Sequence, residues 1–177
     1  MAPQDIWDVY RQLGDGLEAS EAEKLHGRVG ALWGEKAVSA AERLFRREFD
    51  QSLEEARLGS VVEALGDVCE RADLGRMALD FEDASHGLVH VWQYSCPGTG
   101  SEAFEKFIVQ LLQGFHGVVM SRLAGRELRV RWLSTQRKPG ILRFLAGTSQ
   151  RLARWEWQLA GGAVVPTLSL CPAGGAA

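Results

Sequence analysis

Residues 101–124, SEAFEKFIVQLLQGFHGVVMSRLA, decide the fold of this chain. Large apolar side chains recur three or four residues apart here, which is typical of a broad apolar helix face; they are Phe104, Phe107, Ile108, Leu111, Leu112, Phe115, Val118 and Val119. Two glycines, Gly114 and Gly117, interrupt this pattern, and each costs up to about 1 kcal/mol relative to alanine in a helix. We therefore expect a central buried helix, with another backbone packed very closely at the glycines.

From the amino terminus to Leu74, apolar residues recur with the periodicity of helices. Ser20–Glu23 and Ser52–Glu55 have the spacing of a capping box, in which serine and glutamate side chains satisfy the first free N–H groups of a helix. We expect helices that begin at these two serines, the first ending near Phe49. A short amphipathic segment within residues 1–18 is weakened by glycines, so we expect a mobile amino-terminal arm there.

A two-residue alternation replaces the helical period after Gly75. Residues 76–82 and 88–94 alternate on either side of a turn and predict a β-hairpin. Beyond the central helix, residues 127–133 and 141–145 predict two further strands. Residues 151–159, RLARWEWQL, fit a strand or a short helix, and their alternation slightly favours a strand with Trp155 and Trp157 on one face.

The predicted order of elements is a helical first half, a β-hairpin, the long central helix and closing antiparallel strands. This order is typical of an α+β domain with a small, mostly antiparallel sheet. We expect residues 1–177 to form a single domain with a frayed tail at 173–177, because no linker and no internal repeat divides the chain.

Size and composition are those of an ordinary globular domain, since 177 residues with 46% hydrophobic and 24% charged side chains suit one core. No apolar run reaches the roughly 20 residues of a membrane span, and the first residues lack the pattern of a signal peptide. The three cysteines, Cys69, Cys96 and Cys171, are odd in number and scattered. This usage predicts a reducing compartment, the cytoplasm.

Charge is distributed unevenly along the chain. Residues 1–83 carry 10 Lys/Arg and 19 Asp/Glu, whereas residues 121–160 carry nine basic and two acidic side chains. Two differently solvated faces would explain this, as would acidic helices of one copy that meet basic strands of another, or an anionic ligand. Binding to nucleic acid is not expected, because the pI of about 5.8 is unlike that of such domains.

No motif for catalysis or cofactor binding is present. The histidines His26, His86, His90 and His116 lack the convergent ligands of a zinc site, so we expect them to be solvent-facing or hydrogen-bonded. The chain has no Gly-x-Ser-x-Gly elbow and no P-loop lysine, and Cys96 with His90 is only a weak thiol–imidazole candidate. We therefore predict no enzymatic activity, no metal site and no cofactor.

Several residues suit contacts between subunits. Arg129 and Arg131 share the polar face of a predicted strand, and tryptophans bury a large area at little entropic cost. The glycines of the central helix would let a second backbone approach. The candidates for subunit contact are Gly114, Gly117, Arg129, Arg131, Trp155 and Trp157.

Residues 20–145 resemble the D-subunit family of bacterial cellulose synthase. The matching pieces are the segment Leu58–Leu74, the hairpin Arg76–Tyr94, and the segment Phe104–Gly117 with its Leu-Leu-x-Gly-Phe core. The resemblance implies a non-enzymatic accessory subunit of cellulose synthesis and export that promotes crystalline cellulose. Members form a ring-like homo-oligomer, an octamer, with passages for glucan chains.

This resemblance also implies partners and a location. The partners would be other copies of the chain, the glucan chain and the cellulose synthase complex at the inner membrane, with the chain on the cytoplasmic side. The amino-terminal arm lies near the passages in that family. By position, Ile6, Trp7 and Tyr10 would then lie near glucan.

A second resemblance is to the 4-vinyl-reductase-type small-molecule-binding domain. It is carried by Leu74-Gly75-Arg76 before the first predicted strand and by residues 123–128, LAGREL, after the central helix. Zinc-binding cysteines near the end of sensor members are not matched here, because only Cys171 is present. The resemblance implies a small-molecule sensor with a ligand pocket beneath the central helix, under Phe104 to Val119.

Overall fold

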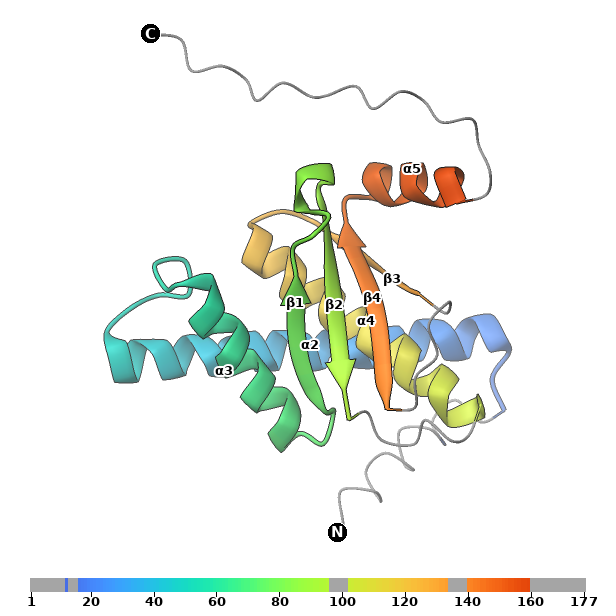
Figure 1. The fold of residues 1–177 in the computed structure, drawn as a ribbon. Coiled ribbons are helices and arrows are strands. Elements are labelled where there is room, and N and C mark those ends of the chain that lie inside the picture. Colours follow the sequence, from blue (N-terminus) through green and yellow to red (C-terminus); the bar gives the residue numbers. More distant parts are fainter. Residues whose placement is uncertain (1–11, 13–15, 96–101, 134–139, 160–177) are drawn as a thin grey trace, which may run out of the picture.

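The computed structural model describes residues 12, 16–95, 102–133 and 140–159 (Figure 1). Several predictions fall outside these residues. They concern the arm with Ile6, Trp7 and Tyr10, the two cysteines Cys96 and Cys171, and the tail at 173–177.

The order of helices and strands confirms the α+β class. Apart from the 3₁₀ turn η1 and the last helix, the elements form helical and extended groups in the predicted order. They are α2 (Ala19–Phe49), α3 (Leu58–Arg71), β1 (Arg76–Asp80), η1 (Ala84–His86), β2 (Leu88–Tyr94), α4 (Glu102–Ala124), β3 (Arg129–Trp132), β4 (Ile141–Gly147) and α5 (Ser149–Leu159).

The four strands form one antiparallel sheet in the order β1-β2-β4-β3. The predicted hairpin is confirmed, with Leu79 opposite Val91 across β1 and β2. The last strand, β4, lies in the middle of the sheet and pairs with β2, where Phe144 is opposite Val91. Consequently β3 is left at one edge, paired only with β4 among the described strands.

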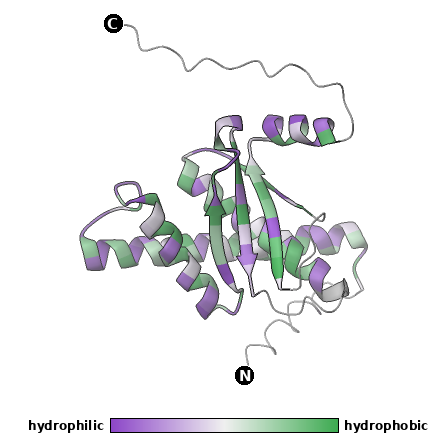
Figure 2. Cartoon of the chain, viewed as in Figure 1, coloured by the Kyte–Doolittle hydropathy of each residue, from purple (hydrophilic) through white to green (hydrophobic). Residues whose placement is uncertain are grey.

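The helices α2 and α4 cover one face of the sheet, while α5 lies near its other face (Figure 1). In Figure 2, green segments, which mark hydrophobic residues, lie along the strands and along the helices behind them. Fully buried side chains of α4 meet those of the sheet in this main core; they include Ile108, Leu112, Phe115, Val119, Val91 and Phe144. The central helix is therefore buried as its sequence predicts.

The close backbone approach expected at the central helix is present at Gly114. A Cβ atom on Gly114 would overlap with the carbonyl oxygen of Gly27 in α2, and one on Gly30 would overlap with that of Leu111. The expectation is wrong for Gly117, because a Cβ atom there would meet nothing within 4 Å. The backbone that approaches α4 at Gly114 thus belongs to α2 of the same chain.

The helix starts differ from the predicted capping boxes. Glu18 precedes the first residue of α2, and no side chain caps that end. The second box does form, because Glu55 Oε2 accepts hydrogen bonds from the Ser52 N–H at 2.8 Å and the Ser52 hydroxyl at 2.9 Å. It closes only a single turn, however, and α3 begins six residues later, at Leu58.

The preference for a strand at residues 151–159 is wrong, since these residues lie in the helix α5. Leu152 is 3% exposed and packs against Leu88 and Leu145, with Trp155 beside them. The three-residue spacing of Leu152 and Trp155 suits a helix face, and this packing outweighs the local alternation. Trp157 falls on another side of α5 and is 47% exposed. The two tryptophans therefore do not share a face.

Within the described part of the chain, no helix has both the length and the apolar character that crossing a membrane requires.

Candidate functional site

An apolar pocket of about 300 Å³ lies where α2, α3 and α4 meet. Its walls combine aromatic, aliphatic and small side chains with one cation; they are Trp33, Lys36, Ala37, Val68, Cys69, Ala72, Leu74 and Phe115. The sensor resemblance predicts a pocket beneath α4. In the space between α4 and the sheet, buried side chains of the two pack against each other. The observed pocket lies beside this space, and α4 contributes Phe115 to its wall.

Helical spacing brings the pocket walls together. Trp33 and Ala37 are four residues apart in α2, and Val68 and Ala72 have the same spacing at the end of α3. The two alanines leave open the space that larger side chains would fill. After α3 the chain turns sharply through left-handed backbone at Asp73 (φ 56°) and Gly75 (φ 80°), which returns Leu74 to the pocket wall.

The buried Cys69 contributes a neutral thiol to the wall of the pocket. Burial raises the pKa of this thiol to about 12, and the neighbouring Gln93 side chain offsets only part of that rise. The thiolate is the reactive form of cysteine. Cys69 is therefore inert at neutral pH, and it packs in the core as a small apolar side chain.

Two buried polar side chains contact residues that line the pocket. Gln93 of β2 donates a 2.8 Å hydrogen bond from Nε2 to the carbonyl oxygen of Leu74, while its Oε1 has no partner in the described structure. His116 of α4 is completely buried against Phe115 and Phe144, and neither ring nitrogen has a partner there. Unsatisfied buried polar atoms are uncommon in proteins, because each loses its hydration.

The expectation that every histidine is solvent-facing or hydrogen-bonded is wrong for His116. Burial lowers the pKa of its imidazole to about 3, so the ring is neutral at physiological pH. The expectation holds for His26, whose Nδ1 lies 2.9 Å from Gln110 Oε1, and for His90, whose Nε2 lies 2.7 Å from Asp83 Oδ2. No three His, Cys, Asp or Glu side chains of the described residues converge to hold a metal ion.

A second hollow, an open groove of about 980 Å³, runs between α2, α4 and the edge strand β3. Its floor is formed partly by backbone at Gly27, Gly114 and Gly117, and basic side chains lie around it; these are Lys24, Arg28, Arg122, Arg129 and Arg131. Arg131 pairs with Glu156 of α5 at 3.0 Å, and Arg129 lies 3.7 Å from Glu127. We call this hollow the β3 groove.

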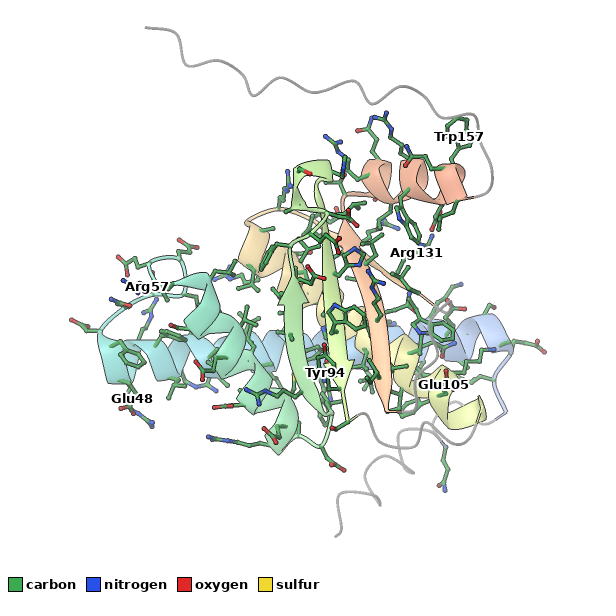
Figure 3. All side chains as sticks on the ribbon, in the orientation of Figure 1. Glu48, Arg57, Tyr94, Glu105, Arg131 and Trp157 are labelled. Atoms are coloured by element: carbon green, nitrogen blue, oxygen red, sulfur yellow. The ribbon has the colours of Figure 1, made fainter. Side chains whose placement is uncertain are left out.

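The structure brings four of the predicted contact residues together in the β3 groove, namely Gly114, Gly117, Arg129 and Arg131. Trp155 packs on the sheet, whereas Trp157 points away from it (Figure 3). The role of all six candidate residues in subunit contact stays a prediction. The sequence does not identify the residues that line the pocket. The spacing of Trp33, Lys36 and Ala37 along α2 is the signal that places three of them close together.

Comparison with known proteins yields a likeness in fold. No family model matches the chain, and no curated protein matches its sequence. A crystal structure of the phenol-responsive sensory domain of the transcription activator PoxR with phenol superposes with a TM-score of 0.59 at 17% sequence identity. The match covers 92% of this chain and 82% of that one. At this identity it shows a shared fold.

Proposed function

We propose that this chain is a small-molecule-binding domain of the sensory type, which acts by binding an apolar ligand rather than by catalysis. The observation that carries the proposal is the pocket between α2, α3 and α4. Its volume of about 300 Å³ is enough for a ligand of one aromatic ring, and its walls are mainly apolar. The fold shared with a phenol-responsive sensory domain supports the same function.

The position of the pocket suits a ligand that changes the stability of the domain. The ligand would contact α2, α3 and α4 at once, and α3 packs in turn on β1. Anything that binds only the folded state stabilises it, by about 2.7 kcal/mol at a concentration of 100 times Kd. A bound ligand would thus stabilise the contacts among α2, α3 and α4.

Calorimetric titration of the full chain with phenol, toluene and indole tests this function. We expect saturable binding of at least one probe and a higher melting temperature in its presence. Ala72→Leu should fill the pocket and abolish binding. Ala40 is half-buried on α2 and lines no described pocket, so Ala40→Leu should leave binding intact. The proposal is wrong if neither these probes nor an aromatic acid or amide of similar size binds saturably, or if Ala72→Leu binds as the native chain does.

A second candidate function is the accessory subunit of cellulose synthesis and export, on the cytoplasmic side of the synthase complex. It is favoured by the β3 groove, whose rim is basic, together with an acidic stripe on α3. Glu63, Asp67 and Glu70 are exposed at helical spacing on that stripe. Opposite charges on separate surfaces of one chain suit a head-to-tail contact between copies, which closes into a ring when the rotation permits.

Light scattering at micromolar concentration tests the assembly function. We expect one discrete homo-oligomer, an octamer in the ring that the sequence resemblance implies. Reversing Arg129 and Arg131 to glutamate should dissociate it, and adding Glu63→Lys and Asp67→Lys should restore part of it. A monomer at this concentration would exclude the ring and with it this candidate, whereas the small-molecule function predicts no particular mass.

A further inference from the structure

We infer that the ligand of the pocket is a small apolar carboxylate, whose acid group is held at the entrance by Lys36. This inference rests on the proposed small-molecule function and adds the chemical class of the ligand. Lys36 is the one charged side chain among the described residues that line the pocket. It is exposed, and it makes no ion pair with any residue that the structure describes.

The interior of the pocket cannot accept a charged group. Apart from Lys36, its described side chains are apolar except for the indole N–H of Trp33 and the protonated Cys69 thiol, which is a weak donor. An isolated carboxylate placed there would lose its hydration without compensation, which costs several kcal/mol. An acid group must therefore stay at the entrance, where water and the Lys36 ammonium reach it.

The walls of the pocket favour an apolar body for the same ligand. Trp33 and Phe115 contribute aromatic surface, and Val68 and Leu74 add aliphatic surface. An aryl or short alkyl group would be removed from water here, at a gain of about 25 cal/mol per Å² of apolar area. Apolar body and charged head together define a small amphipathic acid, such as an arylalkanoate.

The charges of the surrounding chain indicate how far an acid ligand would depend on Lys36. Residues 1–83 carry nearly twice as many acidic as basic side chains. Within α2 and α3 themselves, however, acidic and basic side chains nearly balance, at eight to seven. The helices thus supply no general attraction for anions, and an acid ligand would depend on Lys36 itself. Because Lys36 is exposed, its attraction is screened by salt and is worth about fivefold in affinity at low ionic strength.

Titration of the full chain with 3-phenylpropionate and with its neutral amide tests the inference. We expect the carboxylate to bind about fivefold more tightly at low salt, as an exposed ion pair allows, and the preference to shrink as salt is added. Lys36→Gln should make the two affinities equal, and Lys36→Arg should keep the preference. Lys24→Gln, on the same helix but in the β3 groove, should leave it unchanged.

The outcomes separate this inference from the function on which it rests. If amide and carboxylate bind alike to the native chain, Lys36 does not select an acid, and the small-molecule function stands. A preference that survives Lys36→Gln likewise overturns the inference. If neither probe binds while phenol, toluene or indole does, the class is wrong and the function stands; if no probe binds, both fall.

Discussion

The side chain of Gln93 in β2 donates a 2.8 Å hydrogen bond to the backbone carbonyl oxygen of Leu74, a residue just beyond the end of α3. This bond joins the sheet to a wall of the pocket. Both residues are at most 1% exposed, and the second polar atom of Gln93, Oε1, has no partner among the described groups. The pocket wall is therefore held in place by a polar contact inside an apolar core.

A carboxylate at this position should make stability depend on pH. Gln93→Glu places an acid in the core, where burial raises its pKa above the usual value of about 4.3. The folded state then binds more protons than the unfolded state, so stability is lost as the pH rises. We expect a loss of about 3 kcal/mol by pH 7, measured by urea unfolding at pH 4.5 and pH 7.

Gln113→Glu is the matched control for that experiment. Gln113 is half-buried at the β3 groove and donates a 3.3 Å hydrogen bond to the Val130 carbonyl oxygen. Its carboxylate would stay hydrated, and stability should change little between the two pH values. Equal pH dependence of the two variants would show that Gln93 is not buried as described.

Gly114 and Gly117 should respond in opposite ways to alanine. Gly114→Ala drives a methyl group into the carbonyl oxygen of Gly27, so α2 and α4 must separate, at a cost of about 2 kcal/mol or more. Gly117→Ala meets open space and should stabilise the helix by up to about 1 kcal/mol. Urea unfolding of both variants measures this, and a similar loss in both would contradict the tight contact at Gly114.

The buried imidazole of His116 should weaken the fold in mild acid. Its pKa is about 3 in the folded state, against about 6.5 when exposed. Below pH 6.5 the unfolded state therefore binds the extra proton, and stability falls as the pH falls. The slope approaches about 1.4 kcal/mol per pH unit.

Replacing this imidazole should remove that slope. His116→Leu should flatten the loss of stability between pH 6.5 and pH 4.5, and it should leave the fold more stable than the native chain at pH 4.5. His86→Gln is the control, because His86 is exposed and should leave the slope as it is. An unchanged slope in His116→Leu would mean that the ring titrates normally.

The helix α5 should depend on Leu152 and not on Trp157. Leu152→Ala removes the buried contact with Leu88 and Leu145, at a cost of about 2–3 kcal/mol in the docking of α5. Faster amide hydrogen exchange confined to residues 149–159 would report it. Trp157→Ala should leave this exchange unchanged, because the side chain is 47% exposed. A lower oligomeric mass in Trp157→Ala would instead place Trp157 in a subunit contact.

The local sequence was enough to identify most of the helical and extended segments. The period of apolar residues is a local property, so it predicted the central helix, the hairpin and the α+β class. The glycine interruption at Gly114 indicated a close backbone approach, whereas that at Gly117 did not correspond to one. The prediction was wrong where two local patterns competed, as in α5, and where a capping motif closed a turn at Ser52 before the next helix began.

Which segments meet became known only from the folded chain. The place of β4 in the middle of the sheet depends on pairs such as Val91 with Phe144, which are far apart in the chain. The pocket likewise joins Trp33, Cys69 and Phe115 from three helices. Contacts between residues far apart in the chain depend on packing across the core, so local patterns in a single sequence do not predict them. For the same reason, the partner of Gly114 could be assigned to α2 of the same chain only in the folded structure.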